Sequence, residues 1–276
     1  MDSYCVMGNP VEHSKSPWIH ARFAELTGEA VAYGKRLVPM DGFAAALRAF
    51  HAEGGKGCNV TVPFKFEAAT LVSRRSARAA LAGACNTLRF EGDTIVGDNT
   101  DGIGLVNDLQ RNAGVALAGR DLLLIGAGGA AAGALGSLLE ARPARVVVAN
   151  RTIGKARALV DGHATLAAAN EVALVATSLD AVSGAFDIVI NATATSLAGG
   201  AVPVSASVLK PGALACDLMY GPAARGFLDW ARAHGAVGRD GLGMLVEQAA
   251  EAFLFWRGVR PPSTQVLAEL RAELAR

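Results

Sequence analysis

The sequence has little charge and few cysteines, and both shortages narrow the class of protein. Only 18% of its 276 residues are charged and the net charge is +1, so we expect no nucleic-acid partner, since such proteins carry a basic surface. The four cysteines, Cys5, Cys58, Cys85 and Cys216, are widely spaced and form no zinc-ligand pattern. We therefore expect reduced thiols in a cytoplasmic protein and no metal site.

Targeting and membrane signals are also scarce. Met1-Asp2-Ser3-Tyr4 does not begin a signal peptide, because no basic region or long apolar core follows. The uncharged stretch Leu122–Leu139 is long enough to cross a bilayer, but it contains five glycines. We interpret it as a buried strand, turn and helix, and we expect no membrane association.

That uncharged stretch is the most informative part of the chain. Leu122–Ile125 is a short run of branched apolar residues, which is typical of a buried parallel strand. Gly126, Gly128 and Ala131 then fit G-x-G-x-x-A where a helix begins. In that context the glycines allow a tight turn and a close pyrophosphate, and the helix N-terminus favours the phosphates. The alternative is a Gly/Ala-rich helix without a ligand.

The end of the next strand, Arg145–Ala149, indicates which dinucleotide binds. NAD sites usually place an acidic residue there, on the ribose 2′-hydroxyl. Here Asn150-Arg151-Thr152 follows, with Lys155 close behind. A guanidinium fork and a hydroxyl suit a 2′-phosphate, so we predict NADP(H), and the missing acid argues against S-adenosylmethionine. An ordinary solvated charge is the alternative for Arg151.

The N-terminal part alternates strands and helices. The pattern predicts strands at Tyr4–Gly8 and Val31–Val38 and helices at Trp18–Thr27 and Asp41–Glu53. Ser14 and Ser16 lie in the first loop, just before Pro17. Two interpretations stay open: Ser16 caps the helix ahead of the proline, or the two hydroxyls bind a carboxylate near the helix N-terminus.

Polar residues then gather at the ends of elements. Asn59 and Thr61 alternate with valines, so both leave one face of a strand. Lys65 follows a proline where a helix could begin, and by itself it would be taken for a solvated lysine. Asn99-Thr100-Asp101 precedes a predicted helix at Ile103–Leu109, and capping of that helix is the alternative role there.

The rest of the chain continues the alternation after a hairpin at 84–98. The pattern predicts strands at Val172–Ala176, Phe186–Asn191 and Ala213–Leu218, and helices at Ile153–Val160, Phe227–His234, Met244–Trp256 and Thr264–Leu274. Such alternation is typical of a doubly wound sheet that binds its ligand at the strand ends. We therefore predict an α/β protein with two domains.

Several short motifs follow one another along nearly the whole chain. They are Gly8-Asn9-Pro10, His13-Ser14-Lys15-Ser16-Pro17, Asn59-Val60-Thr61-Val62-Pro63-Phe64-Lys65, Gly83-Ala84-Cys85-Asn86-Thr87, Asn99-Thr100-Asp101-Gly102, Gly126-Ala127-Gly128-Gly129-Ala130, Asn150-Arg151-Thr152, Asn191-Ala192-Thr193, Asp217-Leu218-Met219-Tyr220 and Gly241-Leu242-Gly243-Met244-Leu245. In this order they resemble the shikimate dehydrogenase family, and the ordered set is far more specific than any single motif.

The resemblance implies three segments with different roles along the chain. An N-terminal α/β substrate domain would span residues 1–101, a Rossmann-like doubly wound NADP-binding domain 102–238, and C-terminal helices over 239–276 would return to the substrate domain. The activity it implies is the reversible NADPH-dependent reduction of 3-dehydroshikimate to shikimate, in chorismate and aromatic amino-acid biosynthesis.

The resemblance also assigns roles to individual residues. Ser14 and Ser16 would bind the substrate carboxylate, Thr61, Asn86 and Gln248 its ring hydroxyls, Asn59 and Tyr220 would line the site, and Lys65 and Asp101 would be the catalytic pair. The implied cofactor contacts are Gly126, Ala127, Gly128, Gly129, Ala130, Asn150, Arg151, Thr152, Lys155, Thr193, Met219 and Gly241.

The reaction needs groups of these kinds. Reduction of the C3 carbonyl takes a hydride from NADPH and a proton, which the Lys65 ammonium can donate while it stabilises the developing alkoxide. Asp101 can orient Lys65 and hold a substrate hydroxyl. No metal is needed.

The sequence departs from the family pattern at two places and leaves rivals open. Ala194 and Ser196 replace a serine and a glycine near the expected nicotinamide, and Arg225-Gly226 replaces a Thr-Pro helix start. One rival is a quinate/shikimate dehydrogenase of the same family, and another is a binding protein that senses NADP without catalysis. A monomer and a homodimer both remain open, with small molecules as the expected partners.

Overall fold

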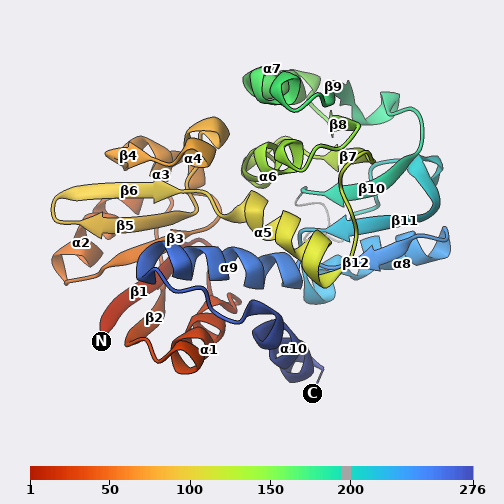
Figure 1. The fold of residues 1–276 in the computed structure, drawn as a ribbon. Helices are drawn as coiled ribbons and strands as arrows, with labels where there is room; N and C mark the ends of the chain where they lie inside the picture. Colours follow the sequence, from red (N-terminus) through yellow and green to blue (C-terminus); the bar gives the residue numbers. More distant parts are fainter. Residues whose placement is uncertain (194–199, 276) are drawn as a thin grey trace. The chain divides into compact units, whose positions relative to one another are not determined.

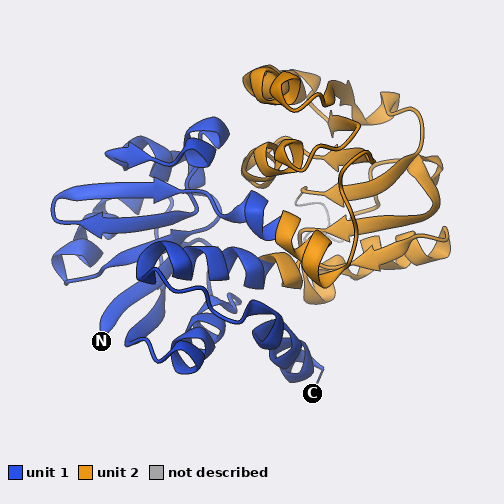
Figure 2. Ribbon diagram, in the orientation of Figure 1, with its two compact units in different colours: residues 1–105, 245–276 blue, residues 106–244 orange. Residues whose placement is uncertain are grey.

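The computed structural model describes residues 1–193 and 200–275, and the chain forms two compact units (Figures 1 and 2). The first unit comprises Met1–Leu105 and Leu245–Arg276, and the second is Val106–Met244. The sequence placed these divisions after residues 101 and 238. Helices α5 (Asp101–Asn107) and α9 (Leu242–Arg257) carry the chain out of the first unit and back.

The first unit is built on a mixed six-stranded sheet in the order β2-β1-β3-β5-β6-β4. Its strands are β1 (Asp2–Gly8), β2 (Val31–Leu37), β3 (Gly57–Val60), β4 (Arg74–Arg75), β5 (Thr87–Glu91) and β6 (Thr94–Asp98). Strands β1, β2 and β3 are parallel, whereas β5 runs antiparallel to β3 and to β6. The parallel half brings the ends of β1 and β3 to one edge, where the polar motifs begin.

Helices cover the sheet of the first unit. They are α1 (Ser16–Thr27), α2 (Phe43–Ala52), α3 (Lys65–Leu71), α4 (Ala77–Ala82) and α10 (Ser263–Leu274), with the C-terminal part of α9. Side chains of β1 alternate between the faces, so Cys5 and Met7 join a core with α2 and α3. Tyr4 lies on the opposite face and stacks on Trp256 of α9, with ring centroids 4.5 Å apart.

The second unit contains a six-stranded sheet in which every pairing is parallel, in the order β12-β11-β10-β7-β8-β9. Its strands are β7 (Asp121–Ile125), β8 (Arg145–Asn150), β9 (Ala173–Ser178), β10 (Phe186–Asn191), β11 (Leu209–Asp217) and β12 (Val237–Arg239). Its helices are α6 (Gly129–Glu140), α7 (Ile153–Ala169) and α8 (Arg225–Ala233), and short helical turns occur at Asp108–Asn112, Leu179–Ala181, Ala206–Val208 and Gly221–Ala224. This strand order is the doubly wound dinucleotide-binding topology, and its direction reverses between β7 and β10. The predicted fold class is confirmed.

Some local predictions were wrong. Helix α1 begins at Ser16 and its N-cap residue is Lys15, so Ser16 is not the cap. Helix α7 does not end at Val160 but continues through Gly162 to Ala169, because tertiary packing overrides the weak helix propensity of a single glycine. The predicted departures at Ala194 and Ser196 lie outside the described residues.

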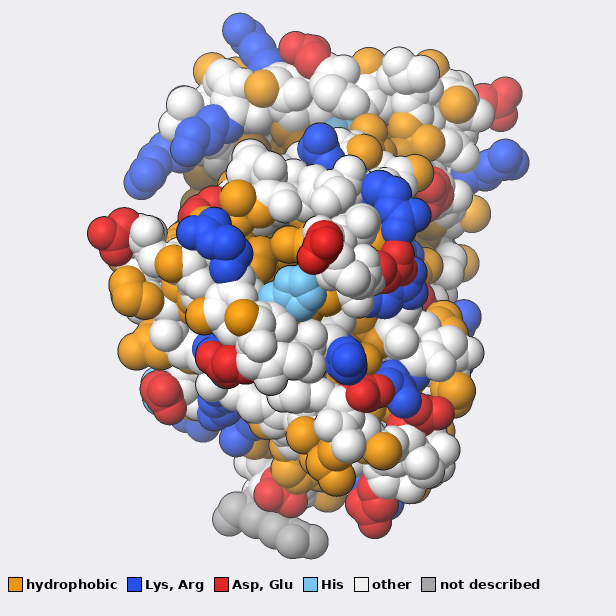
Figure 3. All heavy atoms as spheres, turned by 90° about the vertical axis from the view of Figure 1, so that its left-hand side faces the viewer, with side chains coloured by type: hydrophobic (Ala, Val, Ile, Leu, Met, Phe, Trp, Pro, Cys, Tyr) orange, Lys and Arg blue, Asp and Glu red, His pale blue; other side chains and the backbone are white. Residues whose placement is uncertain are grey.

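The surface and the helix lengths add two observations. No helix among residues 1–193 and 200–275 is long and apolar enough to cross a membrane. On the face drawn in Figure 3, basic and acidic side chains are interspersed with hydrophobic ones. This mixture matches the net charge of +1.

Candidate functional site

In the first unit, Lys65 and Asp101 form a close ion pair. Lys65 is the first residue of α3 and Asp101 the first of α5, and Lys65 Nζ lies 2.6 Å from Asp101 Oδ2. Their side chains are 17% and 7% exposed. A pair shielded from water in this way interacts more strongly than a surface pair, and it keeps the ammonium in one place.

Asn86 links this pair to the rest of the polar cluster. Its Nδ2 lies 2.9 Å from Asp101 Oδ1, 3.0 Å from Thr100 Oγ1 and 3.3 Å from Gln248 Oε1. Its Oδ1 accepts a hydrogen bond of 2.8 Å from the Thr100 backbone N–H. Asn86 is 2% exposed. The structure therefore brings together Lys65, Asp101, Asn86 and Gln248 from four separate segments of the chain.

Asn59 extends the cluster from β3. Its Nδ2 donates to Thr87 Oγ1 at 3.0 Å and to the Asn86 carbonyl at 3.2 Å. Its Oδ1 accepts from the Tyr33 hydroxyl at 2.7 Å. Sequence reasoning did not select Tyr33, Thr87 or Thr100. The sequence could have indicated the two threonines, because each directly follows an asparagine of a quoted motif: Thr87 follows Asn86, and Thr100 follows Asn99.

Ser14, Thr61 and Tyr220 lie on loops, and Ser16 is the first residue of α1. Ser14 Oγ accepts a hydrogen bond of 3.3 Å from the backbone N–H of Ser16, which is 5% exposed. Thr61 directly follows β3, and a Cβ at Gly8 would lie 2.2 Å from its Cγ2. Only glycine at position 8 therefore leaves room for the Thr61 side chain. Tyr220 belongs to the second unit, just after β11.

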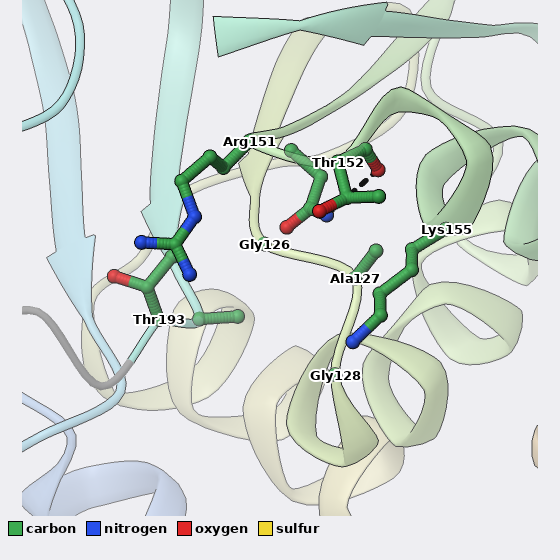
Figure 4. Close-up of a pocket in the computed structure, with 9 residues that line it drawn as sticks. Gly126, Ala127, Gly128, Arg151, Thr152, Lys155 and Thr193 are labelled. Atoms are coloured by element: carbon green, nitrogen blue, oxygen red, sulfur yellow. Dashed lines mark hydrogen bonds between the residues drawn. The ribbon is translucent and has the colours of Figure 1, made fainter.

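In the second unit, a cavity of about 250 Å³ opens at the carboxyl ends of β7, β8 and β10 (Figure 4). Its lining residues are Gly126, Ala127, Gly128, Asn150, Arg151, Thr152, Lys155, Ala192 and Thr193. Eight of these were predicted as cofactor contacts, and Ala192 was not selected. The cavity adjoins the place where the strand order reverses, which is where dinucleotides bind in such sheets.

The glycine turn has the shape that a pyrophosphate requires. Gly126 has φ +112°, a conformation that favours glycine, and a Cβ there would lie 3.1 Å from the Ala192 backbone. Nothing lies within 4 Å of a Cβ built on Gly128. Gly129 and Ala130 begin α6, so their N–H groups belong to the free helix N-terminus. They do not line the cavity itself.

Charged and hydroxyl side chains also line the cavity. Figure 4 shows Arg151 reaching towards Thr193, with the Lys155 ammonium group close to the glycine turn. Within the described residues, neither Arg151 nor Lys155 pairs with a carboxylate, and both are exposed. Two available cations and no acidic residue in the lining fit a dinucleotide with an additional phosphate.

Two predicted cofactor residues lie away from this cavity. Met219 follows β11, and Gly241 immediately precedes α9. The Gly241 N–H donates to the Met219 carbonyl at 2.8 Å, and a Cβ at Gly241 would lie 2.2 Å from the Leu218 carbonyl oxygen. The two residues therefore contact each other closely, although neither lines the cavity. Among the described residues, no group of His, Cys, Asp and Glu could hold a metal ion.

Comparison with protein-family models gives three matches along the chain. A model described as the shikimate dehydrogenase substrate binding domain matches residues 6–88, one described as shikimate / quinate 5-dehydrogenase matches 108–198, and one described as the shikimate 5′-dehydrogenase C-terminal domain matches 241–271. The matches follow the order in which the chain passes through its two units.

Individual relatives extend over the whole length. The chain is 66% identical over 274 residues to a shikimate dehydrogenase (NADP(+)) of Acidovorax sp. (strain JS42), covering 99% of this chain and 97% of the relative. It resembles the crystal structure of an Ael1 enzyme from Pseudomonas putida with a TM-score of 0.88 and 46% identity, over 98% of each chain. It also resembles the shikimate 5-dehydrogenase of Thermus thermophilus in complex with NADP(H) and shikimate, with a TM-score of 0.85 and 30% identity, over 99% of each chain.

Proposed function

This chain belongs to the shikimate dehydrogenase family, and from that premise we propose that it catalyses the reversible NADPH-dependent reduction of 3-dehydroshikimate to shikimate. The observation that carries this proposal is the shielded Lys65–Asp101 pair, which is joined through Asn86 to a cluster of polar side chains. A carbonyl reduction needs a proton donor held among groups that recognise hydroxyls. This cluster supplies both.

The cavity of the second unit is the proposed cofactor site. Bound NADPH supplies the hydride that the substrate carbonyl receives. The N–H groups at the start of α6 would hold the pyrophosphate. Arg151, Thr152 and Lys155 would hold the 2′-phosphate, a role supported by their place around the cavity and by the bidentate geometry of a guanidinium.

Lys65 and Asp101 are the proposed catalytic residues. The Lys65 ammonium would donate a proton to the substrate carbonyl oxygen and stabilise its developing negative charge. Asp101 Oδ2 accepts a hydrogen bond from Lys65 Nζ, and Asp101 Oδ1 accepts one from the Asn86 amide. It would therefore fix the donor and orient the amide that faces the substrate.

The other polar residues are proposed to recognise the substrate. Asn86, Gln248 and Thr61 would bind ring hydroxyls, Ser14 and Ser16 the carboxylate, and Asn59 and Tyr220 would line the site. Amides and hydroxyls both donate and accept hydrogen bonds, so they match a ring that carries several hydroxyls. The mutual hydrogen bonds of Asn86, Asn59 and Gln248 support this assignment, because they order the amides before substrate binds.

Turnover of purified protein tests the proposed function. The absorbance of the reduced nicotinamide would be followed with shikimate and NADP. The assay would then be repeated with quinate in place of shikimate and with NAD in place of NADP. Fast turnover confined to shikimate and NADP is expected. Comparable rates with quinate or NAD would instead favour the quinate/shikimate dehydrogenase, and NADP binding without turnover would remove the catalytic assignment of Lys65 and Asp101.

We also propose a cytoplasmic location. The four cysteines of the described chain are free and buried, which suits a reducing compartment.

A further inference from the structure

A buried pair of polar residues lies at the ends of two neighbouring strands of the second unit. Asn191 is the last residue of β10 and Asp217 the last of β11, and the two are register partners in the parallel sheet. They are 2% and 0% exposed. Asn191 Nδ2 donates to Asp217 Oδ2 at 3.0 Å. Neither residue lines the cofactor cavity.

Each member of the pair holds one of the residues expected to contact the cofactor. Asn191 Oδ1 accepts from Thr193 Oγ1 at 2.7 Å and from the Thr193 backbone N–H at 3.2 Å. Asp217 Oδ1 accepts from the Met219 backbone N–H at 2.8 Å. The Met219 carbonyl in turn accepts from the Gly241 N–H at 2.8 Å.

Donor and acceptor chemistry fixes the direction of these bonds. Both Asp217 oxygens accept, Oδ1 from the Met219 N–H and Oδ2 from Asn191 Nδ2, so the Nδ2 side of the Asn191 amide is turned towards Asp217. The amide oxygen is then directed at Thr193, whose two donors both need an acceptor. One carboxylate therefore sets the orientation of two loops, the first through Asn191 and the second directly through Met219.

The place of these loops in the sheet indicates which half of the cofactor they serve. In a doubly wound sheet the two mononucleotide halves of a dinucleotide lie over the two halves of the sheet. Arg151, Thr152 and Lys155 mark the adenosine half at the end of β8. Met219 follows β11, on the other side of the strand-order reversal, whereas Thr193, after β10, lines the same cavity as Arg151.

We propose that Asn191 and Asp217 are positioning residues: Asn191 holds Thr193 in the wall of the cofactor cavity, and Asp217 holds Met219 towards the nicotinamide half of the bound cofactor. This inference rests on the proposed NADP-dependent function. The pair acts through Thr193 and Met219 and touches no reacting atom.

The test uses two single variants and their combination. In Asp217→Asn, one acceptor oxygen becomes a donor. One bond is therefore lost: the Met219 bond, the Asn191 bond or, when the Asn191 amide turns over, the Thr193 bond. In Asn191→Asp, two carboxylates face each other across a hydrogen-bond distance. In the double variant Asn191→Asp/Asp217→Asn, the amide at 217 donates to the carboxylate at 191, and acceptors for Thr193 and Met219 are both restored.

We expect each single variant to lower kcat/KM for NADP roughly 10- to 100-fold at saturating shikimate, as for the loss of a charge-assisted hydrogen bond. The double variant should return to within about threefold of the wild type, since it restores the bonds to Thr193 and Met219 and the bond between positions 191 and 217. A primary isotope effect measured with deuterated shikimate should change in the single variants only. Asp229→Asn is the matched control and should behave as wild type, because Asp229 is an exposed carboxylate on α8 that pairs with Arg232.

Binding of 2′,5′-ADP, measured by calorimetry, separates this inference from the proposed function. The double variant and Asp229→Asn should bind it as the wild type does, whereas the single variants should bind it less tightly, because Thr193 lines the cavity beside Arg151. Failure of the wild type to bind it would overturn the cofactor site and this inference together. Normal 2′,5′-ADP binding with wild-type kinetics in both single variants would overturn only the inference. If the single variants do not fold, the double variant decides: near-normal kinetics support the proposal, and poor kinetics or failure to fold overturn it.

Discussion

Individual side chains carry the proposed chemistry, and Lys65 makes the sharpest case. A lysine in a loop near a proline is usually solvated, so the residue type alone did not indicate a catalytic role. In the structure its ammonium lies 2.6 Å from Asp101 Oδ2 and its side chain is only 17% exposed. The difference between a surface lysine and a candidate proton donor is the set of groups around it.

Replacement of Lys65 by Met keeps the length of the side chain and removes the proton donor. We expect kcat for shikimate to fall about 10²- to 10⁴-fold, the range for loss of a general acid or base. The Kd for NADP should change less than about twofold, because Lys65 is proposed to act on the substrate and does not line the proposed cofactor cavity. Steady-state kinetics and fluorescence titration measure the two quantities. A variant with near-normal kcat would show that Lys65 is not the donor.

Arg151 is the residue that we propose to discriminate between NADP and NAD. Arg151→Ser removes the guanidinium from the cavity wall while nearby Thr152 and Lys155 remain. We expect KM for NADP to rise roughly 10- to 100-fold, as for a lost charge-assisted hydrogen bond, and KM for NAD to stay the same. Arg232→Ser, on α8, is the matched control because Arg232 pairs with Asp229 at the surface. An equal rise for both cofactors would contradict the assignment to the 2′-phosphate.

At the scale of elements, the polar segment that follows β6 is held by its own anchor. Asp98, the last residue of β6, accepts from Arg78 at 2.5 and 2.8 Å and from Ser76 at 2.5 Å. It also accepts from the Asn99 N–H at 2.7 Å. Burial alone would raise the pKa of Asp98, but the hydrogen bonds from Arg78 and Ser76 outweigh burial and lower that pKa. The anchor therefore joins α4 to the strand that leads to Asp101.

Asp98→Asn keeps the shape of this anchor and removes its charge. We expect the free energy of unfolding to fall by about 1–3 kcal/mol, the range for hydrogen bonds to a charged group. Urea unfolding followed by circular dichroism measures the change. Asp93→Asn, in the exposed turn of the same hairpin, is the control and should leave the midpoint unchanged. If both variants unfold alike, the anchor does not stabilise the first unit.

Some strands could be predicted from the sequence and others could not. Strand β10 was predicted with its observed bounds, because branched apolar residues end there in a polar motif. Strand β12 was missed, because Val237–Arg239 is too short to show any periodicity. It forms only because β11 offers it a partner edge.

At the scale of the whole molecule, a buried histidine should link folding stability to pH. His20 of α1 is 0% exposed, and its ring stacks on Tyr33 with centroids 4.2 Å apart. Neither ring nitrogen has a hydrogen-bond partner among the described residues. Burial in this aromatic surrounding lowers the pKa of His20 to about 3.

Stability should therefore fall as the pH is lowered. The unfolded chain takes up a proton at His20 near the ordinary pKa of 6.5, whereas the folded chain does so only near 3. Unfolding thus binds a proton between these values, and it becomes easier by up to about 1.4 kcal/mol per pH unit. Urea unfolding measured between about pH 7 and pH 4 gives the slope. Over these roughly three pH units, only the imidazole ring of the unfolded chain takes up a proton.

His20→Phe keeps an aromatic ring in place and cannot take up this proton. Its unfolding free energy should depend less steeply on pH than that of the wild type. His234→Gln, at an exposed position, should keep the wild-type slope. A His20→Phe variant with an unchanged slope would mean that the buried ring does not control acid stability.

The sequence by itself determined the fold class, the cofactor motif and the identity of most candidate residues. The fold class and the cofactor motif follow from local properties: branched apolar runs, glycines at a strand–helix turn, and the absence of a carboxylate after β8. The candidate substrate and catalytic residues follow from the ordered motifs that resemble the shikimate dehydrogenase family. The tertiary structure decided which of those residues meet. The hydrogen bonds of Asn86 with Gln248, of Asn59 with Tyr33 and of Asn191 with Asp217 join positions far apart in the chain. No local pattern encodes such contacts, because they arise only when separate strands and helices pack together and exclude water from the polar groups between them.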